Sequence, residues 1–219
     1  MTSKNLIIML PPTAIMISAT NKTGQTVSLN KRITSRTIDL DKIDKVNNLS
    51  RSIKENNLTL EEVEKELTII KKGVPYNYKI EIISSCFISS FFTLLFGGNF
   101  LDFLISFIIG AALKPVLSFL SYLNVNVFFT NLVGGFTVSI LALLSTLVVS
   151  GLNIDKIIIG SVMILVPGLA IVNALRDTIA GDLTSGIIRG AEAFLIAVAI
   201  AVGSGVVLKL WIHLGGTTL

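Results

Sequence analysis

Five stretches of this chain are long and apolar enough to cross a lipid bilayer as helices. A transmembrane helix needs about 20 mainly apolar residues, and such runs occupy residues 80–96, 100–122, 127–150, 157–175 and 187–212. Of all residues, 52% are hydrophobic and 15% are charged, whereas soluble globular proteins carry about 25% charged residues. The chain is therefore not a free cytosolic protein, and we predict an all-α polytopic membrane protein with five transmembrane helices.

The first third of the chain differs in charge from the rest. Residues 1–79 contain thirteen Lys and Arg against eight Asp and Glu, whereas residues 80–219 contain five against six. We predict a division near Pro75 into a small N-terminal domain (1–75) and a membrane domain (76–219). The positive-inside rule assigns the basic part to the cytoplasm, and five spans then leave the C-terminus outside. No nucleic-acid motif accompanies the basic residues, so we expect no nucleic-acid partner.

The N-terminal domain is predicted to be an α+β unit made of a β-hairpin and two helices. Strand-like patterns at residues 13–19 and 26–33 flank an Asn-Lys-Thr-Gly turn. Apolar residues then recur every three or four positions from Leu40 to Ile53, which predicts an amphipathic helix that faces the hairpin. Thr59 and Glu62 have the spacing of a capping box and predict the start of the second helix.

Several kinds of catalytic and metal site lack the residues that they need. His213 is the only histidine and Cys86 the only cysteine, so structural zinc, an internal disulfide and a histidine-based triad are excluded. Gly181 and Gly186 have the spacing of a phosphate-binding loop, but Ile187 and Ile188 stand where Lys and Ser or Thr belong. We therefore expect no bound cofactor or metal and no enzyme activity.

Ionisable residues inside apolar segments are the candidate functional residues. A charge at the centre of a transmembrane helix costs about 2.5–3.5 kcal/mol on insertion scales, so it needs a partner or a water-filled cavity. Glu192 lies about five residues inside the last predicted span, with Arg189 one turn earlier on the same face. A proton or substrate-ammonium site and an interfacial ion pair are equally compatible with this spacing.

A second group of candidates lies at the end of the fourth predicted span. Pro167 and Gly168 can interrupt the helix and free backbone carbonyl groups, and Asn173, Arg176 and Asp177 follow. A binding site around an interrupted helix is one interpretation. The other is a proline kink followed by a charged helix exit.

Asp102 opens the second predicted span and allows three interpretations. The first is a helix cap, which the N-terminal dipole favours. The second is a place on the substrate or proton pathway. The third is a membrane-embedded enzyme in which Asp102, Asp177 and Asp182 hold magnesium; we rank it last because these residues are spread over different helices.

Several of these segments resemble the threonine/serine exporter family, specifically its N-terminal half. The resemblance rests mainly on LVPGLAIVNALRD at residues 165–177, GDL at 181–183 and RGAEA at 189–193. LLFGG at 94–98 with Asp102, and PTAI at 12–15, support it. Relatives usually begin with a further helix before the PTAI strand, so either the true start lies upstream or the N-terminal domain is incomplete.

The resemblance implies a subunit of a secondary exporter for small amino acids, such as threonine and serine, or related carboxylates. It implies a bacterial inner-membrane location, export driven by the proton motive force, and pairing with a second, smaller membrane subunit; a second copy of the chain is the other possible partner. Under this hypothesis Glu192 or Asp177 carries the proton, and Arg176 or Arg189 receives the substrate carboxylate. The alternative is a non-transporting membrane scaffold or sensor whose cytoplasmic domain binds a partner.

Overall fold

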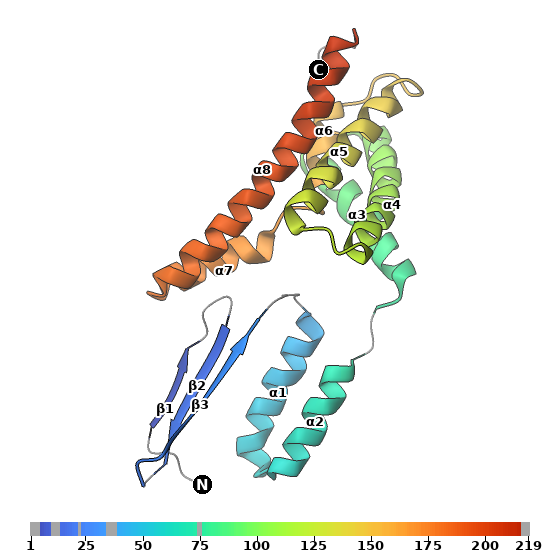
Figure 1. The fold of residues 1–219 in the computed structure, drawn as a ribbon. Helices are drawn as coiled ribbons and strands as arrows, with labels where there is room; N and C mark the ends of the chain where they lie inside the picture. The colour runs from blue at the N-terminus through green and yellow to red at the C-terminus, as the bar shows by residue number, and fades with distance from the viewer. Residues whose placement is uncertain (1–4, 10–13, 22, 34–38, 74–75, 216–219) are drawn as a thin grey trace. The chain divides into compact units, whose positions relative to one another are not determined.

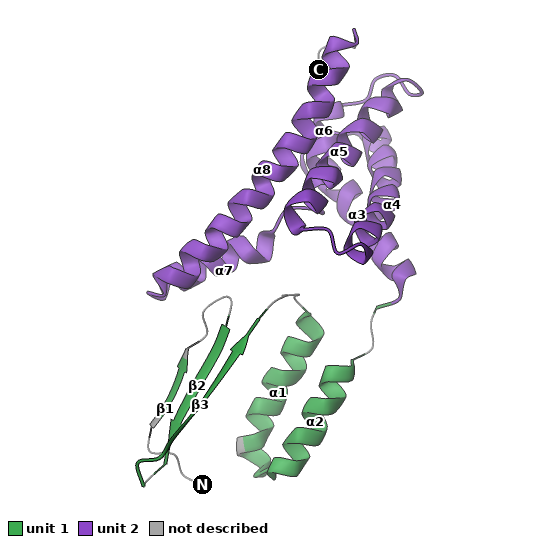
Figure 2. Ribbon diagram, in the orientation of Figure 1, with its two compact units in different colours: residues 1–76 green, residues 77–219 purple. Residues whose placement is uncertain are grey.

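The computed structural model describes residues 5–9, 14–21, 23–33, 39–73 and 76–215. The chain forms two compact units, residues 1–76 and residues 77–219 (Figure 2). Each unit is described separately below.

Unit 1 begins with a three-stranded antiparallel sheet in the order β1-β2-β3. The strands are β1 (Asn5–Met9), β2 (Ala14–Thr20) and β3 (Thr26–Arg32). The predicted hairpin is formed by β2 and β3, with Ile17 opposite Leu29. Gly24 adopts a φ of +83° in the connecting turn, a conformation that favours glycine. Strand β1, which pairs with β2, was not expected from the sequence.

Two helices complete unit 1, namely α1 (Leu40–Asn56) and α2 (Leu60–Lys72). The capping box of α2 is present: Thr59 accepts from the Glu62 backbone N–H, and the Glu62 carboxylate accepts from the Thr59 N–H at 2.8 Å. Among the described residues α1 packs against α2, not against the hairpin as predicted. The two amphipathic helices bury part of their apolar stripes against each other, with Leu49 on the buried side.

Unit 2 consists of six helices that follow one another without strands in its described part (Figure 1). Four of them are long and apolar enough to span a membrane: α3 (Tyr78–Leu95), α4 (Phe100–Tyr122), α5 (Val127–Thr146) and α8 (Leu183–His213). Two shorter helices lie between α5 and α8: α6 (Ile154–Val162) and α7 (Gly168–Ile179).

The fourth predicted span, residues 157–175, is therefore not one continuous helix. Helix α6 ends at Val162, three residues form turns, and α7 begins at Gly168. Pro167 has no backbone N–H to donate, and a proline also disfavours the helical conformation of the residue before it. The described part of the chain thus contains four continuous candidate spans rather than the five that composition predicted.

The packing of unit 2 places small polar residues inside and large apolar residues outside. Helix α3 buries Ser85, Ser89 and Thr93, whereas Phe91 and Leu95 on the same helix are 58% and 74% exposed. In water this arrangement would be unfavourable, but in a bilayer the large apolar side chains meet lipid and small residues let helices approach closely. The apolar core lies where α4, α5, α6 and α8 meet.

Candidate functional site

Most of the predicted site residues lie on α7 and α8. Pro167 precedes α7 and Gly168 begins it, while Asn173, Arg176 and Asp177 lie along that helix. Arg189 and Glu192 lie in the first third of α8. Asp102 lies apart from this group, in the first turn of α4.

Helices α7 and α8 form a tight helical hairpin. Gly181, with a φ of +88°, makes the turn, and Asp182 caps α8 by accepting from the Ser185 backbone N–H at 3.1 Å. Gly186 faces Thr178 so closely that an added Cβ would lie 3.0 Å from the Thr178 backbone nitrogen. Helix α7 therefore lies directly against the beginning of α8 (Figure 1).

The carboxyl group of Asp182 lies outside the spanning helix, and its pKa is below the ordinary value of aspartate. Hydrogen bonds from Ser185, first from the side chain and second from the backbone, stabilise the ionised form, and the charge of Arg189 adds to the effect. Asp182 is thus committed to capping α8.

An ion pair between Asp177 and Arg189 joins the two helices. The Asp177 Oδ2 atom lies 3.0 Å from Arg189 Nε, and the side chains are 26% and 34% exposed. Among the described residues neither atom makes an aligned hydrogen bond, so the contact is electrostatic. The sequence pattern had suggested Glu192 as the neighbour of Arg189. The sequence feature that could have predicted the observed pair is the opposite charge of Asp177 and Arg189 on either side of a short turn.

Asn173 and Glu192 lie one helical turn further along the same hairpin. Asn173 precedes Asp177 by four residues, and Glu192 follows Arg189 by three, so each shares a face with a member of the ion pair. Because α7 and α8 run in opposite directions through the turn, both displacements lead toward the interruption before α7. Asn173 and Glu192 are half-buried. These four residues are called the polar seam below.

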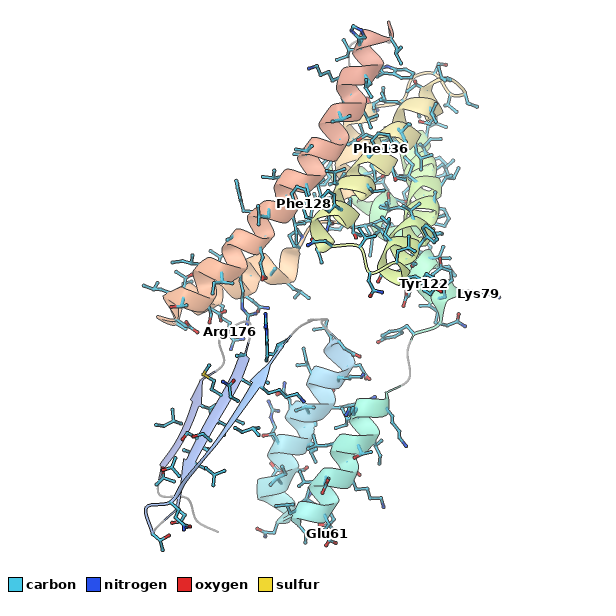
Figure 3. All side chains as sticks on the ribbon, in the orientation of Figure 1. Glu61, Lys79, Tyr122, Phe128, Phe136 and Arg176 are labelled. Atoms are coloured by element: carbon cyan, nitrogen blue, oxygen red, sulfur yellow. The ribbon has the colours of Figure 1, made fainter. Side chains whose placement is uncertain are left out.

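Arg176 lies on the other face of α7 (Figure 3). Its side chain is exposed and borders a shallow apolar hollow with Val172, Leu175 and Ile179. Ala174, Asp177 and Thr178 form the face toward α8, as the contacts of Gly186 and Arg189 show. The structure therefore joins Asp177 to Arg189 and not to Arg176.

The interruption between α6 and α7 leaves backbone groups without helical partners. Among the described residues, no backbone N–H bonds to the carbonyl oxygens of Met163, Ile164 or Leu165. Irregular backbone at membrane depth is tolerated where protein or a water-filled cavity surrounds it. A Cβ atom placed on Gly168 would have no described atom within 4 Å apart from those of its own helix backbone and its chain neighbours. There is therefore space beside the start of α7.

Asp102 belongs to a different group of residues. It is fully buried and accepts hydrogen bonds from the Asn99 N–H, the Asn153 N–H and the Asn153 side-chain amide at 2.8–2.9 Å. It also forms a capping box with Asn99 at the start of α4. Asn153 was not recognised in the sequence, because the segment Gly151-Leu152-Asn153 between two apolar runs reads simply as a loop.

Glu81 was also missed. Its Oε2 lies 2.9 Å from Lys114 Nζ, so an ion pair joins α3 to α4. Within the described residues, no group of three or more His, Cys, Asp or Glu side chains is placed to hold a metal ion.

Comparison with known proteins identifies a family and a curated relative. A family model described as a threonine/serine exporter matches residues 3–211. A threonine/serine exporter of Corynebacterium glutamicum is 28% identical over 177 residues, which cover 78% of this chain and 36% of that protein. The chain thus corresponds to about a third of the relative's length. No solved structure matches it.

Proposed function

Because the chain belongs to the threonine/serine exporter family, whose members are transporters and not enzymes, we propose that it is a subunit of a secondary exporter. Its proposed substrates are small amino acids or related carboxylates. Threonine and serine are the first substrates to test, because the curated relative is named for them. The four apolar helices and the outward-facing phenylalanine and leucine side chains agree with a multi-pass membrane protein.

The ion pair between Asp177 and Arg189 is the observation that carries the proposed site. A zwitterionic amino acid has a carboxylate and an ammonium group, and the polar seam offers one cation and two carboxylates to receive them. In our proposal Arg189 binds the substrate carboxylate, and Asp177 or Glu192 receives the ammonium group. Arg189 is favoured over Arg176 because Arg176 lies on the face of α7 away from the seam.

The interruption before α7 supports a substrate passage beside the seam. Transporters commonly bind substrates near the bilayer midplane, where interrupted helices present free backbone groups. Pro167 and Gly168 lie at such an interruption, and Asn173, a member of the polar seam, follows Gly168 by less than two helical turns. We propose that the substrate passes between this interruption and the polar seam.

Proton coupling is assigned in this proposal to Glu192 or Asp177. A carboxyl group that alternates between water and a partner can bind and release a proton during each cycle, and both side chains are only partly exposed. An uncoupler, which collapses the proton gradient across the membrane, should then abolish export.

The proposed location is the bacterial inner membrane, with the N-terminus in the cytoplasm and the C-terminus outside. The basic N-terminal part supports this orientation. Figure 1 draws the beginning of α3 and the turn between α7 and α8 toward one end of unit 2, and the end of α8 toward the other. This arrangement suits an odd number of crossings in which α6 and α7 together make the fourth.

A second membrane unit completes the passage in this proposal, either a smaller membrane protein or a second copy of the chain. A midplane site normally forms between two related halves, and the chain matches 36% of the length of its curated relative.

The test is efflux of labelled threonine, serine and dicarboxylates from cells that express the full chain, with and without the proposed smaller membrane subunit. We expect efflux of at least one substrate, its loss on addition of an uncoupler, and a loss of about tenfold or more for Glu192→Gln. Glu64→Gln, an exposed glutamate of α2, is the matched control. A scaffold or sensor would tolerate neutral replacement of both Asp177 and Glu192, and that outcome would reject the exporter.

A further inference from the structure

Asp102 and Asn153 link the beginnings of two helices that are far apart in the sequence. Asp102 lies in the first turn of α4, and Asn153 immediately precedes α6. The Asn153 backbone N–H donates to Asp102 Oδ1 at 2.9 Å, and its side-chain amide donates to Oδ2 at 2.8 Å. We propose that Asp102 is a positioning residue for export, which anchors α6 and thereby sets the depth of the interruption between α6 and α7. This inference rests on the function proposed above.

The hydrogen bond of the Asn153 side chain supports the proposal that Asp102 anchors the start of α6. An asparagine that precedes a helix usually accepts a hydrogen bond from the helix's first free N–H groups. Asn153 makes no such cap, and its amide points instead to Asp102. The start of α6 is therefore attached to α4 at the expense of its own capping.

A carboxylate is required at this position because its two oxygen atoms serve three donors. Oδ2 accepts from both the Asn99 N–H and the Asn153 amide, and Oδ1 accepts from the Asn153 N–H. Asparagine has only one acceptor oxygen and would direct an NH₂ group at N–H donors. Asp102 itself is fully buried, whereas Asn99 and Asn153 are exposed, so the buried carboxylate is held by donors at the surface of the unit.

Further contacts hold the body and the far end of α6 to the same helices. Ser161 Oγ accepts from Ser89 Oγ of α3 at 2.7 Å. Gly160 lies so close to α3 that an added Cβ would be 2.6 Å from the Thr93 Cα atom. Thr93 in turn donates to Ser106 of α4 at 2.7 Å. Helix α6 is thus attached to the α3–α4 pair along its length.

Because the start of α6 is anchored, the length of α6 sets how deep in the bilayer the helix ends. Nine residues at about 1.5 Å each extend about 13 Å, roughly half of a 30 Å hydrocarbon layer. Measured from the beginning of α4, the helix therefore ends near the middle of the layer. Helix α7, by contrast, packs closely only against α8 among the described elements. Asp102 thus fixes one side of the proposed passage, and α7 belongs to the other.

The experiment combines hydrogen exchange and efflux on the full chain, with its membrane partner where efflux requires one. In Asp102→Asn we expect amide exchange of residues 154–162 to rise about tenfold, because the start of α6 loses hydrogen bonds that attach it to α4. We expect the maximal rate of threonine efflux to fall by a similar factor, while the half-saturating concentration changes less than about twofold. Asn153→Ala removes only the side-chain bond and should give a smaller effect of the same kind.

Matched variants separate positioning from general damage. Asp155→Asn changes an exposed carboxylate of the same helix, which pairs with its neighbour Lys156, and should leave exchange and efflux unchanged. The double variant Asp102→Asn with Asn153→Asp restores one donor–acceptor pair and should recover part of both losses.

Unchanged exchange of residues 154–162 in Asp102→Asn would overturn the anchor, and raised exchange with a normal maximal rate would overturn the positioning role. A wild-type chain that exports none of the substrates would instead reject the proposed function, and the positioning role with it. The exchange result would then still report whether Asp102 holds α6.

Discussion

Arg189 Nε lies 3.0 Å from Asp177 Oδ2, and this contact connects α8 to α7 across the turn at Gly181. Both side chains are partly exposed, and the hairpin is also held by the close contact of Gly186 with Thr178 and by the cap at Asp182. Its value to the protein therefore lies in what the two charges can bind rather than in holding the hairpin together.

Exchanging the two charges tests that conclusion. We expect Asp177→Arg combined with Arg189→Asp to preserve the ion pair and the thermal unfolding midpoint, yet to leave threonine efflux at about a tenth of wild type or less. The reason is that a substrate held in one orientation would meet charges of the wrong sign. Efflux and unfolding of the detergent-solubilised chain are measured side by side. Full recovery of efflux would mean that the pair is only structural.

Arg176 and Arg189 should differ in their effect on export. Arg189→Gln removes the cation of the seam and is expected to reduce threonine efflux by about tenfold or more. Arg176→Gln removes an exposed charge on the opposite face of α7 and should reduce it less than about twofold. Efflux at equal protein levels in the membrane is the measurement. A larger loss in Arg176→Gln would move the carboxylate-binding role to that residue.

Gly203 and Gly205 provide a paired test of the contact between α5 and α8. A Cβ on Gly203 would collide with the Leu132 carbonyl oxygen and lie 3.0 Å from the Phe136 nitrogen, whereas nothing lies within 4 Å of one on Gly205. Overpacking costs about 1–3 kcal/mol, so Gly203→Ala should lower the unfolding midpoint by about 3 °C or more. Gly205→Ala should not lower it. Equal midpoints would show that the two helices separate easily.

The capping box of α2 should make its first turn sensitive to acid. The Thr59 backbone N–H, and secondly the Thr59 hydroxyl, lower the pKa of the Glu62 carboxyl. A carboxyl whose pKa is lower in the folded state stabilises the fold above its unfolded pKa, and this contribution is lost as pH falls through the folded value. We therefore expect the first turn of α2 to lose amide protection between about pH 5 and pH 3.

Two variants check the cause of this acid sensitivity. Thr59→Val should raise the pKa of Glu62 in a carbon-detected NMR titration of the full chain, because it removes the hydroxyl donor. Glu62→Gln should remove the pH dependence of protection in the first turn, and Glu61→Gln should leave it intact. An equal pKa of Glu62 in Thr59→Val and in the wild-type chain would contradict the hydrogen-bond explanation.

Local features of this fold could be predicted because their causes are local. Thr59 with Glu62 is a cap at a spacing of three residues, and long apolar runs specify α3, α4, α5 and α8 whatever their neighbours. The fourth run was harder, since composition alone counts it as a span. Pro167 and Gly168 indicated that it could break, but composition does not say whether a proline bends a helix or ends it.

Membrane character and membership of the threonine/serine exporter family could be inferred from the amino-acid sequence, because apolar run lengths and short motifs can be read without knowing the fold. The partners of the charged residues could not be inferred in this way. Asp177 meets Arg189 and Asp102 meets Asn153, 51 residues away, because helix packing selects which side chains share a buried space. A polar group in an apolar surrounding must find a partner, but many residues could satisfy that need. The choice among them depends on the three-dimensional arrangement of the helices.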